Sequence, residues 1–127
     1  MSVTHSTASK DLATNAVVDQ LDGAGSKFCF RISSAGAIAA TLTMATPAFG
    51  ASSAGTATAG AITTNTNCAG NASAVSHATL QTSADVVAIT CQVAASASDI
   101  NMTGGLTIGA GDTVSVTNFL TYAALSA

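Results

Sequence analysis

The sequence predicts an all-β protein: an antiparallel β-sandwich, jelly-roll or immunoglobulin-like, with a short N-terminal helix or arm. Three observations predict this class. Apolar and polar residues alternate in short segments after Gly25, which is the period of half-buried strands. Small polar loops separate these segments at intervals of about ten residues, as in sandwiches. Helical periodicity is confined to the residues before Gly25. We therefore divide the 127 residues into a polar arm, 1–9, and one domain, 10–127, that begins with the helix.

Residues 10–22 are predicted to form this helix. Ser9 is a suitable N-cap, and Asp11 complements the positive end of the helix in its first turn. Two glycines at 23 and 25 end the helix. The apolar residues that fall near one face, and that we expect to pack inward, are Leu12, Ala16, Val17 and Leu21.

The two strands after the helix are predicted from strict alternation. In the strand 27–32, the side that carries Phe28 and Phe30 faces the core, whereas Cys29 and Arg31 face the other way. A turn at 33–36 leads to a second strand, in which Ile38, Ala40, Leu42 and Met44 alternate with Ala and Thr.

The rest of the chain predicts shorter strands. Segments 56–62 and 74–80 are weakly patterned, and 86–93 is the clearest strand, with alternate apolar residues on one face. Residues 99–102 are expected to form a short edge strand, and 113–122 the final strand. The residues that define the face of 86–93 are Val87, Ile89, Cys91 and Val93, and those that anchor the final strand are Val114, Val116 and Leu120.

The composition favours a structural building block over an enzyme. Charged residues make up 7% of the chain, against about 25% in an ordinary soluble domain. Six acids, all aspartate, and three cations give a net charge of −3. Ala, Ser, Thr and Gly take the place of charged residues, so few groups are able to perform acid, base or metal chemistry. We expect no enzymatic activity and no cofactor.

Several partner classes are also excluded by composition. Three cations cannot build a basic patch, so we expect no nucleic acid. Aromatics are 4% of the residues and Trp is absent, which argues against a small-molecule substrate. No segment has the roughly 18 consecutive apolar residues of a membrane span. The first residues lack a secretory signal, and Met1 favours synthesis in the cytoplasm followed by release on lysis.

Candidate catalytic and metal-binding residues are few and scattered. His5 lies in the arm and His77 in the strand 74–80, and nothing in the sequence places Asp85 and a serine beside His77 as a triad requires. Asp99 and Asp112 lack the spaced-aspartate loop of a calcium site, and we expect the aspartates to cap turns. The expected catalytic, cofactor-binding and metal-binding sets are therefore all empty.

The chain has three cysteines without metal-ligand spacing. Cys29, Cys68 and Cys91 are expected to be small buried apolar residues. A disulfide between Cys68 and Cys91 remains an alternative for assembly in oxidising surroundings.

Six short segments follow one another in a characteristic order, at 22–25, 42–49, 50–55, 61–63, 98–101 and 109–116. In this order they resemble a family of small tailed-bacteriophage virion proteins. The similarity covers most of residues 10–120, and the strand 74–80 departs from it: family members often carry aromatic and Arg residues there, and this chain has Val75, Ser76 and His77. The resemblance implies a virion component, and we infer a capsid decoration (cement) protein.

We therefore expect a structural virion protein on the capsid exterior that stabilises the phage head by bridging major capsid proteins. A homotrimer over local three-fold positions is the expected oligomer, made in the cytoplasm of the host bacterium. The expected contact surfaces are residues 1–25, 56–62 and 74–80. The alternative is a tail or fibre module that contacts host surface glycans, which requires exposed aromatic side chains.

Overall fold

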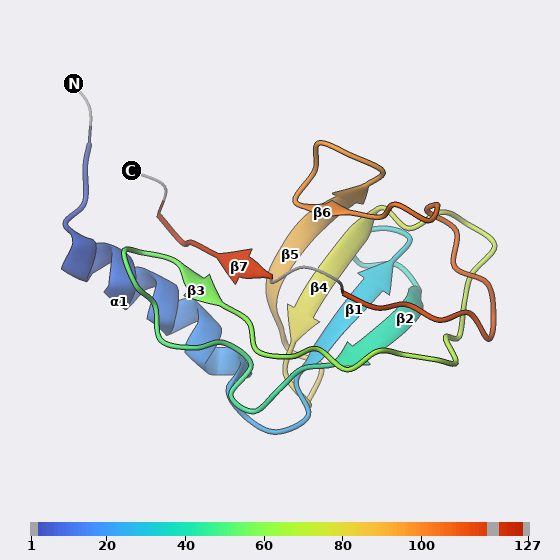
Figure 1. Cartoon of the computed structure of the whole chain (residues 1–127), viewed down its shortest axis with the longest axis horizontal. Coiled ribbons are helices and arrows are strands. Elements are labelled where there is room, and N and C mark those ends of the chain that lie inside the picture. The colour runs from blue at the N-terminus through green and yellow to red at the C-terminus, as the bar shows by residue number, and fades with distance from the viewer. Residues whose placement is uncertain (1–2, 117–119, 126–127) are drawn as a thin grey trace.

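The structure is a computed structural model that describes residues 3–116 and 120–125. It is mostly strands and loops, with one short helix at the N-terminal side (Figure 1). A further short 3-10 helix continues the first helix. In chain order the elements are α1 (Thr7–Val18), η1 (Asp19–Leu21), β1 (Lys27–Arg31), β2 (Ile38–Thr43), β3 (Ala57–Thr58), β4 (His77–Gln81), β5 (Val87–Ala94), β6 (Ile100–Asn101) and β7 (Thr121–Tyr122).

A five-stranded sheet in the order β2-β1-β4-β5-β6 is the centre of the fold. The pairs β2–β1, β1–β4 and β4–β5 are antiparallel, but β5 and β6 run parallel, through Val93 beside Ile100 and Ala94 beside Asn101. The sheet is therefore mixed, and the prediction that it is purely antiparallel is wrong at this edge. The parallel pair forms because the five-residue excursion 95–99 between β5 and β6 returns the chain to the same end of the sheet.

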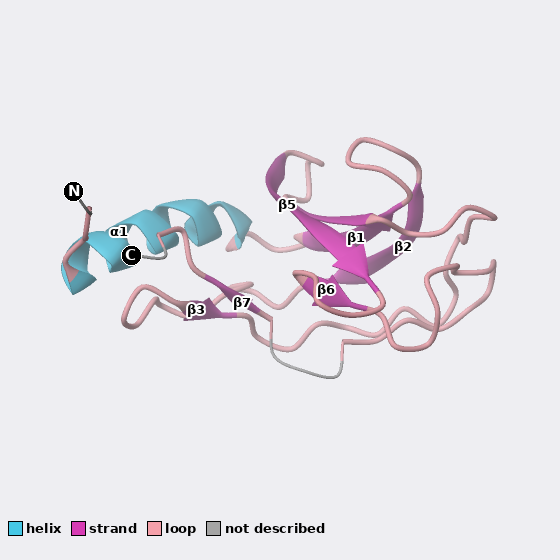
Figure 2. Ribbon diagram, turned by 90° about the horizontal axis from the view of Figure 1, so that it is seen from above, coloured by secondary structure: helices cyan, strands magenta, loops and turns pink. Residues whose placement is uncertain are grey.

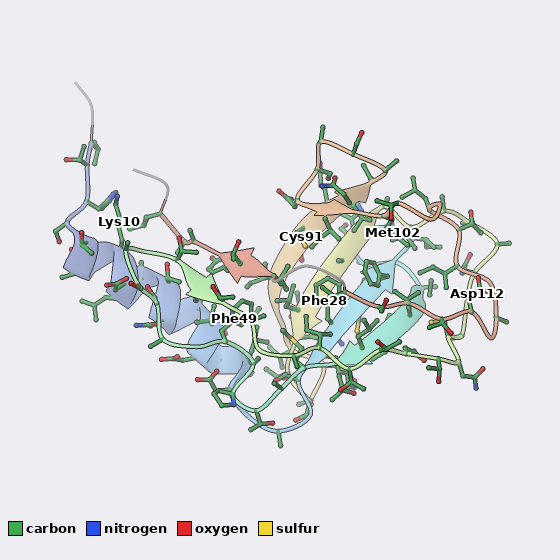
Figure 3. All side chains as sticks on the ribbon, viewed as in Figure 1. Lys10, Phe28, Phe49, Cys91, Met102 and Asp112 are labelled. Carbon is green, nitrogen blue, oxygen red and sulfur yellow. The ribbon has the colours of Figure 1, made fainter. Side chains whose placement is uncertain are left out.

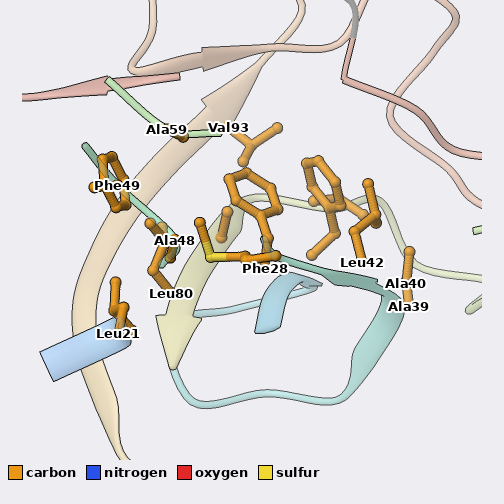
Figure 4. Packing of buried hydrophobic residues seen from close by; sticks show 14 of the residues in the cluster. Leu21, Phe28, Ala39, Ala40, Leu42, Ala48, Phe49, Ala59, Leu80 and Val93 are labelled. Atoms are coloured by element: carbon orange, nitrogen blue, oxygen red, sulfur yellow. The ribbon is translucent and has the colours of Figure 1, made fainter. Parts of the chain in front are cut away.

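One face of the curled sheet is covered by long loops, and the small antiparallel pair β3–β7 lies to the side of the sheet, next to α1 (Figure 2). The core lies between the sheet and these segments. Phe28 and Phe30 of β1 point into it and contact each other edge to face, with ring centroids 5.0 Å apart. Phe49, Ala57 and Ala59 belong to the same buried cluster (Figure 4).

The helix differs from the prediction at both ends. Ser6, not Ser9, is the N-cap, and its side chain accepts a hydrogen bond from the Ser9 amide. The helix therefore begins at Thr7, inside the predicted arm, and ends at Val18, before the predicted limit. Its buried residues are Thr14 and Val18, with Leu21 following in η1.

The helix face that points inward is also not the predicted one. Leu12 is 72% exposed, and Ala16 is exposed too. Leu21 is buried as predicted, and Val17 is half-buried. Polar contacts, described below, turn the helix so that Leu12 faces solvent.

The strands agree with the prediction best in the centre of the sheet. The predicted strands at 27–32, 38–44, 86–93 and 99–102 correspond to β1, β2, β5 and β6, within a few residues at each end. In the described parts of the segment 113–122, which are 113–116 and 120–122, Val114 forms a single bridge with Asn65 and β7 covers two residues. The predicted bulge near Phe119 lies outside the described residues. Residues 56–62 contain only the short β3, and 74–80 overlaps β4.

The outer edge of the sheet at β2 is closed by the segment 62–70. The Thr63 amide donates to the Thr43 carbonyl at 2.9 Å, and the Gly70 amide donates to the Ala39 carbonyl at 2.8 Å. Between them the Asn65 side-chain amide donates to the Thr41 carbonyl. Since these carbonyls alternate along the free side of β2, the loop closes the edge without being a strand.

Candidate functional site

A polar clamp attaches the inner face of α1 to the loop 51–56. The Asp11 carboxylate accepts hydrogen bonds from the Ser52 hydroxyl and from the Gly55 amide, the latter at 2.8 Å. The Asn15 side-chain oxygen accepts from the Ser52 amide at 2.9 Å. The clamp therefore joins two segments about 40 residues apart through hydrogen bonds, where apolar packing would be the usual solution.

Thr14 completes the clamp from the centre of the inner face. Its hydroxyl donates to the Gly55 carbonyl at 2.7 Å and accepts from the Ala124 amide at 3.1 Å. The Thr14 side chain is fully buried, and both partners are backbone groups. The helix is thereby tied to a loop and to the C-terminal part of the chain at once.

Electrostatics support the clamp. Hydrogen bonds from the Ser52 hydroxyl and the Gly55 amide lower the pKa of Asp11, which keeps this carboxyl ionised at neutral pH. Gly55 has φ +85°, and a side chain at this position would contact Lys10. Gly55 is thus required both for its backbone conformation and for the close approach of the helix.

Apolar contacts hold the other end of the helix. Val18 and Leu21 are 1% and 0% exposed and belong to the buried cluster. The buried Ser26 hydroxyl donates to the carbonyls of Leu21 and Gly23, which fixes the turn from the helix into β1. The helix is therefore held along its whole length, by polar contacts at the N-terminal half and apolar contacts at the C-terminal half.

The outward surface of α1 is nearly uncharged and carries an exposed leucine. We define this surface by Ala8, Leu12, Ala16 and Asp19, all of which are exposed. Residues four and seven apart lie on one side of a helix, so these four form a continuous strip. Lys10 lies on the opposite side, against Gly55 (Figure 3).

A second cluster of polar side chains covers the other face of the five-stranded sheet. The Arg31 guanidinium donates from Nε to the Thr79 hydroxyl and from Nη2 to the Gln81 side-chain oxygen, both at 2.9 Å. A third donation, from Nη1, goes to the Gly36 carbonyl. Thr79 also donates to Gln81. Thr79 and Gln81 are 0% and 1% exposed, because Arg31 lies across them.

The same cluster ends in an ion pair at the surface. The Lys27 ammonium lies 2.7 Å from the Asp85 carboxylate, which also accepts from the Gln81 amide nitrogen. These two donors lower the pKa of Asp85, and the hydrogen bond to Asp85 raises the pKa of Lys27. The polar groups of this face thus have partners within the chain.

The structure separates the residues that a catalytic triad would require. His77 begins β4, and its Nδ1 lies 2.7 Å from the hydroxyl of its neighbour Ser76, which donates to the Ile32 carbonyl. Asp85 follows the other end of β4, in the contact with Lys27. His5 precedes α1 and is exposed. The sequence residues His77 and Asp85 are therefore not brought together.

Asp99 and Asp112 accept backbone hydrogen bonds, as predicted for aspartates at turns. The Asp99 carboxylate accepts from the Gln92 amide at 3.0 Å, and the Asp112 carboxylate accepts from the Gly109 amide at 2.7 Å. Within the described residues, no group of three or more His, Cys or Asp side chains is placed to hold a metal ion.

The cysteines are free thiols. Cys29 and Cys68 are buried and Cys91 is half-buried, so the alternative of a Cys68–Cys91 disulfide is not realised in this structure. Burial raises the pKa of all three, that of Cys91 to about 11. Thiols of this kind stay protonated at neutral pH and are poor nucleophiles.

An open depression of about 840 Å³ lies between the loop 99–108 and the segment 112–116. Phe30, Met102 and Ile108 form part of its lining. Leu120, which follows undescribed residues, contributes as well. Asp99 and Asp112 also line the depression, and their carboxylates accept the hydrogen bonds from backbone amides given above.

The clamp was missed in the sequence, although a signal for it exists. Asp11, Thr14 and Asn15 are spaced three and four apart, as the residues of one helix face are. That face is polar, so a search for apolar periodicity passes over it.

The segments expected from the sequence as contact surfaces differ in their exposure. Residues 74–80 lie largely in the interior, because β4 is central in the sheet and its residues Ala78 to Leu80 are buried. Residues 56–62 remain partly exposed, and the outer surface of α1 is exposed.

No protein-family model, curated protein or solved structure matches this chain. In the described part of the chain, no helix has the length and apolar character of a membrane span.

Proposed function

We propose that this protein is a structural virion component without catalytic activity, and specifically a capsid decoration (cement) protein of a tailed phage. It binds the capsid exterior as a homotrimer and bridges neighbouring major capsid proteins. Synthesis takes place in the host bacterial cytoplasm. Many modest contacts, repeated by the symmetry of the head, resist the internal pressure.

The observation that carries this proposal is the outer surface of α1. The polar clamp holds the helix rigidly while Leu12 remains 72% exposed in a strip whose single charged member is Asp19. A rigid surface loses little conformational entropy on contact, and a surface with few charges desolvates at low cost. These are the properties that a repeated stapling contact requires.

Two further observations support a non-catalytic role. The thiols have raised pKa values, and the histidine and aspartate that a triad would need lie at opposite ends of β4. The polar face of the sheet forms a closed network in which Arg31 and Asp85 already have partners.

For the architecture, we infer a sandwich of the jelly-roll or immunoglobulin-like kind. Its first layer is the five-stranded sheet. The second layer consists of β3, β7 and the isolated bridges that flank them, such as Phe49 with Ala59. The shared buried cluster between these layers supports this inference.

The glycan-binding alternative is less favoured. Sugar recognition uses exposed aromatic rings, and Phe28, Phe30 and Phe49 are all buried. Tyr122 is half-buried. Phe119 lies outside the described residues.

The test is the copy number of this chain in purified phage particles, measured by quantitative mass spectrometry against the major capsid protein. We expect on the order of hundreds of copies per particle, as the symmetry of a head requires. Particles that lack the chain should release their genome at a lower temperature than complete particles. Adding the protein back should raise the release temperature to that of complete particles. About a dozen copies or fewer would point to a fibre or baseplate instead.

A further inference from the structure

The helix α1 is turned with its polar face inward and its leucine outward. Asp11, Thr14 and Asn15 face the protein, where each forms hydrogen bonds to the chain. Leu12 faces solvent. A surface helix of a globular protein has the opposite arrangement, and α1 follows the usual rule only at its C-terminal end, where Val18 and Leu21 are buried. The outward strip around Leu12 therefore has the character of a face that a second surface covers.

The C-terminal end of the helix carries a charge that opposes the helix dipole. Its first turn contains no acid and its last turn no base. Lys10 and the ionised Asp11 lie together near the N-terminal end and offset each other, whereas Asp19 is the C-cap. A negative group beside the negative end of a helix is unfavourable. Asp22, directly after η1, adds a second carboxylate to this end, and burial and the charge of Asp19 raise its pKa.

We propose that the outer surface of α1 pairs with the same surface of a second copy of this chain, the two helices running antiparallel. An antiparallel neighbour brings its positive N-terminal end to Asp19, which corrects the charge placement in both copies. A parallel neighbour would bring the two Asp19 carboxylates together. The choice of a second copy as the occupant rests on this charge complementarity.

The spacing along the helix sets the register. Leu12 lies midway between Ala8 and Ala16, four residues from each. In an antiparallel pair centred on Leu12, the two leucines meet, and Ala8 of each copy faces Ala16 of the other. Asp19 then faces the residues just before and within the first turn of the neighbouring helix. Alanines on both sides of the leucine let the two helix backbones approach closely.

The pair is weak by itself. One helix of twelve residues contributes much less than the 1,200–2,000 Å² or so of a stable interface. We expect a dissociation constant of about 10 µM to 1 mM in solution. Such a contact gains strength where many copies are held side by side. The inference does not require the virion role, since it is measured on the isolated protein. On a phage head, this two-fold pair would be the stapling contact between one trimer and the next, and it would not build the trimer itself.

The test is sedimentation equilibrium of the full-length chain, up to concentrations of about 1 mM. Leu12→Ala should raise the dissociation constant about tenfold or more, because the substitution removes Leu12 of both copies from the centre of the pair. Val86→Ala is the matched control, since Val86 is 59% exposed elsewhere on the molecule and its loss should leave self-association unchanged. A wild-type chain whose association is equally insensitive to both changes overturns the proposal.

A charge exchange tests the antiparallel register. Ala8→Glu and Ala16→Lys should each weaken the pair, the first by placing a carboxylate near Asp19 of the other copy. The double variant should restore the pair, since each new carboxylate then faces a new ammonium. Both single changes suit the helix dipole, so the fold is retained, which circular dichroism checks. A double variant weaker than both single variants indicates a parallel pair and overturns the register.

Discussion

Both faces of the five-stranded sheet contain fully buried residues, but these are buried by different means. On one face Phe28, at 1% exposure, packs among apolar neighbours. On the other face, Thr79 and Gln81 are as deeply buried, with exposed fractions of 0% and 1%, and Arg31 donates a hydrogen bond to the side chain of each. The difference teaches that a polar side chain of this protein is buried as fully as an apolar one where its hydrogen-bonding groups have partners within the chain. The same two solutions recur along α1, where a polar clamp precedes an apolar end.

The largest effect is expected from a cavity in the apolar face. Phe28→Ala should lower the free energy of unfolding by about 3–5 kcal/mol, because it removes a fully buried ring and its contact with Phe30. Chemical denaturation followed by circular dichroism measures the change. Phe28→Leu, which keeps most of the volume, should cost much less, about 1 kcal/mol. Equal losses for both variants would contradict the packing that we describe.

A smaller effect is expected on the polar face. Thr79→Val keeps the shape of the side chain but removes an acceptor for Arg31 Nε and a donor to Gln81. The unfolding free energy should fall by about 1–3 kcal/mol, the cost of unsatisfied buried polar groups.

Thr43→Val is the matched control for this change. Thr43 is an exposed threonine on β2, opposite Lys27 in the register. Its substitution should change the free energy by less than about 0.5 kcal/mol. If Thr79→Val proves as neutral as Thr43→Val, the network does not stabilise the fold.

The smallest effect is expected at the exposed end of the polar network. The pKa of Asp85 is lowered in the folded state, so the carboxylate stabilises the fold above its unfolded pKa. That stabilisation disappears as the pH falls through the lowered folded pKa. Asp85→Asn should therefore reduce stability slightly at neutral pH and should remove this part of the acid dependence.

The measurement is the midpoint of urea unfolding at a series of pH values from about 7 to about 3. Lys27→Met removes the other partner of the ion pair and should flatten the same part of the curve. An acid dependence that is identical in the wild type and both variants would show that Asp85 is not stabilised by these contacts.

Local sequence pattern was sufficient for the centre of the sheet. The alternation in β1 predicts that Phe28 and Phe30 lie on one side and Arg31 on the other, as the structure confirms. Burial of Thr79 was not predicted, because the arginine that covers it comes from the neighbouring strand β1. Alternation with a period of two assigns each side chain to a face of the sheet, but it does not show which residues cover that face.

The orientation of α1 could not be predicted from the sequence for a different reason. Its inner face is chosen by Ser52, Gly55 and Ala124, which lie between 37 and 110 residues away from the helix residues they contact. Apolar spacing alone favoured Leu12 as an inward residue. Only the tertiary partners make Asp11 and Asn15 the better buried side chains, since a buried polar group needs a partner in place.

The last third of the chain illustrates a third limit. Residues 113–122 have strand-like composition, yet Val114 forms only one bridge and β7 is two residues long. Strand propensity describes how well a side chain fits a sheet surface, and it does not supply a neighbouring edge to pair with. Here the edge at β2 is already occupied by 62–70.

That occupied edge limits how copies of the molecule can join. A fibril grows by adding strands, and each copy must then offer a bare row of carbonyl and amide groups at both margins of its sheet. Thr43, Thr41 and Ala39 have already accepted hydrogen bonds from their own chain. A strand of a second copy therefore finds no free carbonyl at these three positions, and amyloid growth through this margin is blocked.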